Sequence, residues 1–256
     1  DLVATPPSKW MPDYLGKGAR IGFDPWLHTI SEVKSLETAV AKFGGVLVPL
    51  ESNPIDTIWD DQPELPLGKV TIQPLEFAGK TAREKIEDMK AALAKAGADA
   101  TVLTDPSSLA WIFNIRGADV PHTPVALGFA IIKAMGEPVV FLDVRKLPVK
   151  TKVYLTQLCE LVPPENLEAA LIEIAAGKTV ALDPALAADK LRQLVIEAGG
   201  TVIEEQDPAR LPRARKNAAE LQGSRAAHRR DGAAMTAFLD WYGRQVPGSL
   251  DEIAAA

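Results

Sequence analysis

Short apolar segments alternate with amphipathic ones through the middle of the sequence, and this alternation constrains the fold more than any other feature. Ala100–Leu103 and Thr179–Leu182 have the length and composition of buried strands. Leu167–Ala175, which lies between them, carries apolar residues at helical spacing. Helices that alternate with strands pack their apolar faces against one sheet. The sequence therefore predicts an α/β domain, with a mixed sheet flanked by helices, over residues 77–207.

The clearest helix signal lies near the start of this domain. Thr81 and Glu84 form the Thr-x-x-Glu pattern of a capping box, and Gly97 supplies the expected helix end. The apolar stripe between them consists of Ile86, Met89, Leu93 and Ala96. We also expect a helical turn from Ser107, helices over 153–159, 167–175 and 185–198, and strands over 125–132, 138–142, 161–162 and 201–204.

The region before this domain is expected to be incomplete. Upstream of the Pro-rich connector 61–66, the sequence predicts only a strand, a helix and a strand, over 20–24, 31–43 and 46–50. These elements are too few to close a core, so we expect more sheet before Asp1. The sequence begins without an initiator Met and ends at Ala256 without a closing element. Both ends are therefore expected to be cuts through a larger protein.

A long helix is predicted after the linker 208–212. It runs from Asn217 to about Arg244, with Asn217 as the N-cap and Glu220 as its capping-box partner. A helix of this length with one apolar stripe needs a partner surface, and no segment of the sequence supplies one. For His228, approach to an active site and packing within the stripe both stay open, and its register favours packing. The stripe repeats every seven residues, at Leu221, His228, Met235 and Tyr242.

Composition excludes several classes of function. The net charge of −6, without any basic run interleaved with aromatic residues, predicts no nucleic-acid partner. No apolar run approaches the roughly 20 residues that span a bilayer, so we expect no membrane partner. A single cysteine, Cys159, cannot form an internal disulfide, which is typical of a reducing cytoplasm. Its apolar neighbours favour a small buried residue over a reactive thiol.

Motifs that carry chemistry are missing, with one loop as the candidate site. The sequence has no glycine-rich nucleotide fingerprint, no phosphate loop, no His-Glu-x-x-His and no cysteine pair. Residues 114–124 nevertheless combine Arg116, Asp119 and His122 with two prolines and a glycine. A stiff loop that presents Arg116 and His122 is able to bind a carboxylate or a carbonyl. The alternative, which the spacing favours, is an Arg116–Asp119 ion pair that fastens the loop and leaves His122 exposed.

Two long runs of the sequence resemble a known family. Residues 107–120, Ser-Ser-Leu-Ala-Trp-Ile-Phe-Asn-Ile-Arg-Gly-Ala-Asp-Val, resemble the second domain of cytosolic three-domain Xaa-Pro aminopeptidases, and residues 121–132 continue this match. Residues 215–232 resemble the helix that opens the catalytic domain of the family. Residues 3–10 and 55–59 resemble the latter half of its first domain. The resemblance covers essentially the whole chain.

This resemblance implies a domain plan and an activity for the intact protein. Residues 1–66 are then the latter part of a first creatinase-like domain, and 77–207 form a second one. Residues 208–256 are the linker and first helix of a truncated, pita-bread catalytic domain. The metallopeptidases of the family remove the N-terminal residue of peptides with proline at the second position, using two divalent metal ions, usually manganese. A cytoplasmic homodimer is implied as well.

The resemblance also implies which groups this chain lacks. The five metal ligands of the family, two Asp, one His and two Glu, lie downstream of residue 256. We therefore expect no catalytic or metal-binding residue here, and no activity of the chain alone. The loop 114–124 is expected to face the catalytic cavity, which makes Arg116 and His122 substrate-binding residues. Two other interpretations stay open, a non-enzymatic module that binds peptides or proteins and a structural dimerisation piece. The presence or absence of metal ligands downstream discriminates the peptidase from the binding module.

Overall fold

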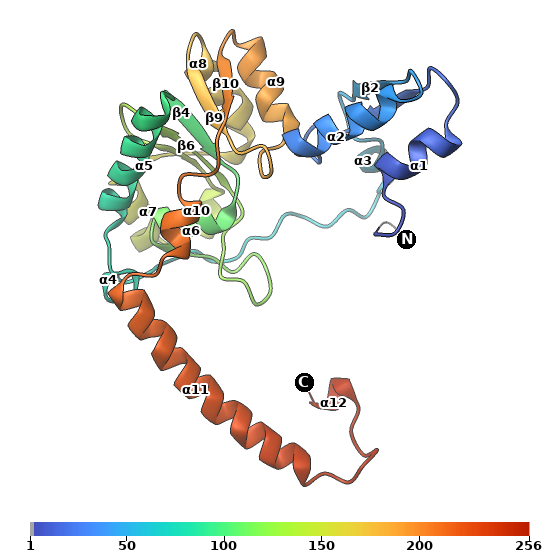
Figure 1. The fold of residues 1–256 in the computed structure, drawn as a ribbon. Coiled ribbons are helices and arrows are strands. Elements are labelled where there is room, and N and C mark those ends of the chain that lie inside the picture. Colours follow the sequence, from blue (N-terminus) through green and yellow to red (C-terminus); the bar gives the residue numbers. More distant parts are fainter. Residues whose placement is uncertain (1–2, 256) are drawn as a thin grey trace.

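The computed structural model describes residues 3–255, which form a small N-terminal unit, a larger central unit and a long C-terminal helix (Figure 1). The central unit is built on a mixed sheet of six strands in the order β10-β9-β4-β6-β7-β8. β10, β9 and β4 run parallel, β6 runs antiparallel to β4 and β7, and β8 is parallel to β7. The strands are β4 (Ala100–Leu103), β6 (Phe129–Lys133), β7 (Val139–Phe141), β8 (Glu160–Val162), β9 (Thr179–Leu182) and β10 (Thr201–Glu204).

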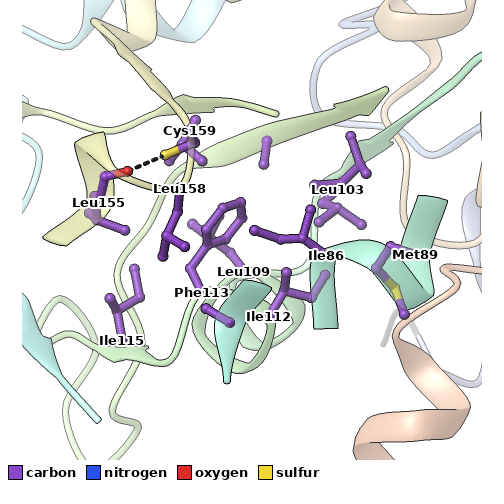
Figure 2. Packing of buried hydrophobic residues seen from close by; sticks show 14 of the residues in the cluster. Ile86, Met89, Leu103, Leu109, Ile112, Phe113, Ile115, Leu155, Leu158 and Cys159 are labelled. Carbon is purple, nitrogen blue, oxygen red and sulfur yellow. Dashed lines mark hydrogen bonds between the residues drawn. The ribbon is translucent and has the colours of Figure 1, made fainter. Parts of the chain in front are cut away.

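Side chains alternate along each strand and divide the core into two hydrophobic layers. In β6, Ala130 and Ile132 belong to one layer and Ile131 belongs to the other. The first layer includes residues of α5 (Ala82–Ala96), α6 (Pro106–Ile112) and α7 (Val149–Thr156), and Figure 2 shows it around Phe113. The second layer includes residues of α8 (Leu167–Ala175) and α9 (Asp189–Glu197). The predicted α/β fold with a mixed sheet flanked by helices is therefore confirmed.

Several local signals act as the sequence predicts. Thr81 and Glu84 close a capping box at the start of α5, and Gly97 ends that helix in the left-handed conformation at φ 70°. The predicted strands at 100–103, 179–182 and 201–204 and the helix at 167–175 have the expected bounds. Cys159 is buried, as predicted, and its thiol donates to the carbonyl oxygen of Leu155 at 3.3 Å (Figure 2). Burial raises the pKa of this thiol to about 12, so it is an inert core residue.

Several predicted elements have different bounds, and for three of them the reason is local. The strand expected over 125–132 begins at Phe129, because the N–H of Leu127 donates to Asp119 Oδ2 rather than to a neighbouring strand. The helix expected over 153–159 is α7, which begins directly after Pro148, where a proline is tolerated. The helix expected over 185–198 is α9, which begins at Asp189 because residues 184–186 form a hydrogen-bonded turn.

The N-terminal unit has a much smaller core. It contains α1 (Pro7–Tyr14), β1 (Arg20–Phe23), α2 (Ile30–Ala41), β2 (Val46–Pro49) and α3 (Pro54–Ile58), with β1 parallel to β2. Its hydrophobic cluster has Met11, Ala39 and Val40 as buried members among the described residues. The predicted strand, helix and strand are thus present, and they bury little.

The turn before α2 and the turn before α9 join the N-terminal and central units as a reciprocal pair. Both turns begin with Asp-Pro directly after a strand, at Asp24-Pro25 and at Asp183-Pro184. Equivalent backbone groups exchange hydrogen bonds, so each turn satisfies donors of the other. The pairs are Ile30 N to Ala187 O (3.1 Å) with Asp189 N to His28 O (2.9 Å), and Ser31 N to Pro184 O (2.8 Å) with Lys190 N to Pro25 O (2.9 Å).

The C-terminal helix α11 (Ala218–Gly243) extends away from the sheet (Figure 1). Asn217 caps it and closes a capping box with Glu220, as predicted. None of its residues is buried, and Leu221 and Met235 of the stripe are 42% and 56% exposed. No partner for the stripe therefore lies within residues 3–255.

No helix in the same range has the length and hydropathy needed to cross a membrane. The remaining short elements are β3 (Thr71–Ile72), β5 (Ile115–Arg116), α4 (Leu75–Ala78), α10 (Arg210–Ala214), α12 (Glu252–Ala255) and the 3₁₀ turns Val144–Lys146 and Pro164–Asn166.

Candidate functional site

Arg116 ends β5, which pairs antiparallel with β3. Its guanidinium is half-buried, and Nη1 donates to the carbonyl oxygens of Ala110 at 3.2 Å and Ile115 at 2.8 Å. Burial lowers the pKa of Arg116, and the negative charge of Glu220 opposes that shift. Arginine remains charged under such a shift. The loop therefore holds one partly desolvated cation in a fixed direction.

The expected Arg116–Asp119 ion pair is wrong. The side chain of Asp119 is fully buried and pairs with Lys146 Nζ at 2.7 Å. Asp119 also accepts from the backbone N–H of Gly68 at 2.8 Å and of Leu127 at 2.7 Å. A buried carboxylate with three donors ties its surroundings together. Asp119 thus fastens the loop to Gly68, which follows the connector, and to Leu127, which precedes β6, while the charge of Arg116 is directed elsewhere.

His122 lies at the exposed tip of the loop. Its φ is 60°, in the left-handed region that few residues other than glycine adopt. The turn is closed by the N–H of Thr123, which donates to the carbonyl oxygen of Val120 at 3.1 Å. Arg116 lines a cavity that begins beside this turn, whereas His122 does not line it. The structure therefore does not bring the two predicted site residues into one pocket.

A cavity of about 240 Å³ lies between α6, the loop and α10. One of its walls is Arg213, which sequence reasoning missed. Arg213 Nη2 contacts Asp105 Oδ2 at 2.7 Å, while its Nη1 is buried without a hydrogen-bond partner among the described residues. Burial alone would raise the pKa of Asp105, but hydrogen bonds from Arg213 and Ser107 lower it overall. The lining is Ser107, Ala110, Trp111, Arg116, Thr123, Pro124, Val125 and Arg213.

A buried lysine supports the wall that carries Trp111. Lys85 is 1% exposed, and its Nζ donates to the carbonyl oxygen of Trp111 at 2.9 Å and to Asn114 Oδ1 at 2.8 Å. The same Nζ lies 4.1 Å from the centroid of the Trp111 ring. Burial lowers the pKa of Lys85 to about 8, with Glu220 opposing the shift. The only signal for this role in the sequence is a lysine in an otherwise apolar helix face.

The first turn of α11 is attached to the same wall. Trp111 Nε1 donates to Glu220 Oε1 at 3.1 Å, and Asn217 Nδ2 donates to the carbonyl oxygen of Ala78 at 2.9 Å. A Cβ at Gly79 would lie 2.3 Å from Asn217 Oδ1, so this close approach requires glycine. The start of the long helix is thus fixed to the central unit, although none of the residues of the helix is buried.

Metal ligands do not cluster in the described part of the chain. Within residues 3–255, no group of three or more His, Cys, Asp or Glu side chains is placed to hold a metal ion. His228 is exposed on α11, and its Nδ1 lies 2.8 Å from the carbonyl oxygen of Ser224 one turn earlier. The described residues therefore do not fit a two-metal centre.

Comparisons with known proteins extend over nearly the whole chain. Residues 61–220 match the family model of the creatinase/prolidase N-terminal domain. Probable Xaa-Pro aminopeptidases P from Paracoccidioides lutzii and Ajellomyces dermatitidis are each 35% identical to this chain over 91% of it. The crystal structure of X-prolyl aminopeptidase from Caenorhabditis elegans, a cytosolic enzyme with a di-nuclear active site, superposes on 98% of this chain with a TM-score of 0.87 at 27% identity.

The chain is much shorter than these relatives. It spans 40% of the length of the two curated relatives and 42% of the C. elegans structure. The family match covers more than half of this chain, and the six-stranded sheet lies within it. The chain therefore belongs to the creatinase/prolidase N-terminal domain family and is homologous to the N-terminal part of Xaa-Pro aminopeptidase P.

Proposed function

We propose that this chain is the non-catalytic N-terminal portion of a metal-dependent Xaa-Pro aminopeptidase, which removes the N-terminal residue of peptides with proline at the second position. The observation that carries the proposal is the superposition of 98% of the chain on an X-prolyl aminopeptidase of which it spans only 42%. The described residues offer no metal-ligand cluster. The proposal therefore assigns two divalent metal ions, with manganese as the proposed metal, to the remainder of the protein.

In this proposal the chain supplies the wall against which a peptide substrate is placed. Arg116 is the main candidate, because its cation is half-buried and no ion pair within residues 3–255 engages it. Such a group can pair with a peptide carbonyl or carboxylate at greater strength than an exposed one. His122, at the exposed tip of the loop, is proposed to donate to a peptide carbonyl from outside the cavity. Neither residue would ligate metal.

The assembly is part of the same proposal. The unpartnered stripe of α11 is assigned to the remainder of the protein, which follows it in the relatives, and the complete enzyme is proposed to be a cytoplasmic homodimer. Support for the compartment is the description of the C. elegans relative as a cytosolic enzyme. Apolar residues such as Met235 and Leu239, 56% and 59% exposed, are expected to become buried in that assembly.

The test is hydrolysis of an Xaa-Pro tripeptide with added manganese. The protein that continues this chain to the length of its relatives is expected to release the first residue, whereas the 256-residue chain alone is expected to show no turnover. Metal-dependent turnover by the chain alone would contradict the proposal. Peptide binding without hydrolysis by the longer protein would favour the non-enzymatic binding module.

Substitution tests the loop itself within the longer protein. Arg116→Ala and His122→Ala are expected to reduce kcat/KM by about tenfold to a hundredfold, equivalent to about 1–3 kcal/mol of transition-state stabilisation. Arg145→Ala is the matched control, because Arg145 is exposed and pairs with Asp143 on another part of the unit. Unchanged kcat/KM in both loop variants would indicate that the loop is structural and does not bind substrate.

A further inference from the structure

Two guanidinium groups line the cavity beside α6, and no acidic side chain is among the described residues that line it. Arg116 reaches it from β5, and Arg213 reaches it from α10. Segments nearly a hundred residues apart in the sequence thus bring like charges to one small space. Asp105 pairs with Arg213 at 2.7 Å from outside the lining, and Glu220 acts on Arg116 from the first turn of α11. The cavity is therefore lined by two cationic side chains and by no carboxylate, which favours an anionic group as its ligand.

Both arginines have donor capacity left over. Arg213 uses Nη2 on Asp105, and its buried Nη1 has no acceptor among the described residues. Arg116 uses Nη1 on two carbonyl oxygens, which hold the group in place without neutralising it. A buried donor without an acceptor costs free energy. A ligand oxygen in the cavity can accept from the donors that Arg116 has left, and it would satisfy Arg213 once that guanidinium turns its Nη1 toward the cavity.

The remaining walls are apolar and limit the size of the ligand. Trp111, Pro124 and Val125 form them, and the volume is about 240 Å³. Typical sites for whole small ligands are larger, about 300–1,000 Å³. The cavity therefore suits the end of a molecule that combines a carboxylate with an apolar stem. Inorganic phosphate would leave the apolar walls uncovered.

We propose that this cavity binds the C-terminal carboxylate of a short peptide between Arg116 and Arg213, with the last side chain against Trp111, Pro124 and Val125. The choice of a peptide rests on the proposed function, whereas the binding of an organic carboxylate does not depend on it. The pair would make the protein favour short peptides with a free C-terminus over amidated ones. It adds Arg213 to the candidate residues and leaves His122 outside the subsite.

The binding test uses the 256-residue chain labelled with ¹⁵N. The indole N–H resonance of Trp111, assigned by its loss in Trp111→Phe, reports on the cavity wall. N-acetyl-Pro-Leu is expected to shift this resonance in a saturable way. Its C-terminal amide is expected to bind at least tenfold more weakly, which corresponds to about 1.4 kcal/mol. Equal binding of acid and amide would overturn the proposal, as would no shift with either.

Substitutions and two further probes locate the source of binding. Arg116→Gln and Arg213→Gln are each expected to weaken the acid at least tenfold, and Arg145→Gln is expected to leave it unchanged. If the spectrum of Arg213→Gln is no longer dispersed, that variant is not folded, and the test then depends on Arg116→Gln. Full binding of the acid by Arg116→Gln would overturn the proposal. Inorganic phosphate, or the α-amide of N-acetyl-glutamate, whose one carboxylate is on the side chain, would exclude a peptide C-terminus as the ligand if it bound as tightly as N-acetyl-Pro-Leu.

The outcome is independent of the peptidase assignment. Should the longer protein hydrolyse Xaa-Pro peptides while the chain shows no preference for the free acid, the subsite fails and the proposed function stands. Should the chain bind the acid while the longer protein hydrolyses nothing, the proposed function fails and the carboxylate site stands.

Discussion

The helices α8 and α11 are both predicted from sequence periodicity, but they differ in how much of their surface is buried. α8 has nine residues and buries Leu171 completely, whereas α11 has 26 residues and buries none. The short helix is held by the second core layer, and the long one by its capping box and its first turn. Isolated helices in water are marginal even when their sequence favours them. The sequence of a helix can therefore specify the helix locally, while the surface against which it packs is specified by another segment.

A matched pair of leucine substitutions gives the largest contrast between these helices. Leu171→Ala in α8 is expected to destabilise the chain by about 2–5 kcal/mol, because it leaves a cavity in a close-packed layer. Leu239→Ala in α11 is expected to change stability by less than about 0.5 kcal/mol, since its side chain is 59% exposed. Urea unfolding of the two variants measures both. Similar losses would break the distinction between a packed and an unpartnered helix.

The stability of the chain is expected to depend on pH through Lys85, which supports the wall to which α11 is attached. Burial lowers the pKa of Lys85 to about 8, below its ordinary value of 10.5. Between these values the unfolded chain binds more protons than the folded one, so stability rises as pH increases from about 8 to 10.5. The rise is expected to reach at most about 3 kcal/mol.

Two lysine variants isolate this pH dependence. Lys85→Met is expected to flatten the rise in unfolding free energy across this window, whereas Lys95→Met, at an exposed position of the same helix, is expected to preserve it. The measurement is the free energy of unfolding at several pH values. A rise that persists unchanged in Lys85→Met would show that the lysine does not titrate in the folded state as described.

The proposed boundary after residue 207 can be sharpened by comparing two truncations. Ending the chain at 216 keeps Ala209, which is fully buried, and the contact of Arg213 with Asp105. Ending it at 207 removes both, and is expected to cost about 1–2 kcal/mol more. The central unit is expected to melt cooperatively in both forms. Loss of cooperative melting in the shorter form would contradict the proposed boundary.

The smallest expected effect concerns the cap of α11. Asn217→Ala removes the acceptor for the N–H of Glu220 and the donor to Ala78. It is expected to lower the stability of the helix start by about 1 kcal/mol. Hydrogen exchange of the first turn of α11 should therefore accelerate, while the amides of α8 are unaffected. An equal acceleration in both helices would indicate a global rather than a local loss.

Local features of the fold could be predicted from the sequence, because their causes are local. The capping boxes at Thr81 and Asn217 and the glycine end at Gly97 are set by residues within one turn of each other. Pairings between distant segments could not be predicted in this way. Nothing in the spacing of the loop indicates that Asp119 would select Lys146 over the nearer Arg116.

The candidate site was therefore only half predicted. Arg116 was identified from its loop, but Arg213 lies on α10, a short helix that was not predicted and that overlaps the segment 208–212 interpreted as a linker. The sequence does carry one signal of a distant contact: Asp-Pro follows a strand at both Asp24 and Asp183, and the paired turns connect the two units. An internal repeat of this kind would have predicted that the units contact each other through equivalent positions.

The central claim is that α11 is completed by the remainder of a longer protein, and hydrogen exchange tests it most directly. The amides of residues 225–243 are compared between the 256-residue chain and the protein that continues to the length of its relatives, with α8 as an internal reference. The account predicts exchange at least tenfold slower for α11 in the longer protein, and no change in α8. Equal exchange of α11 in both proteins would contradict it.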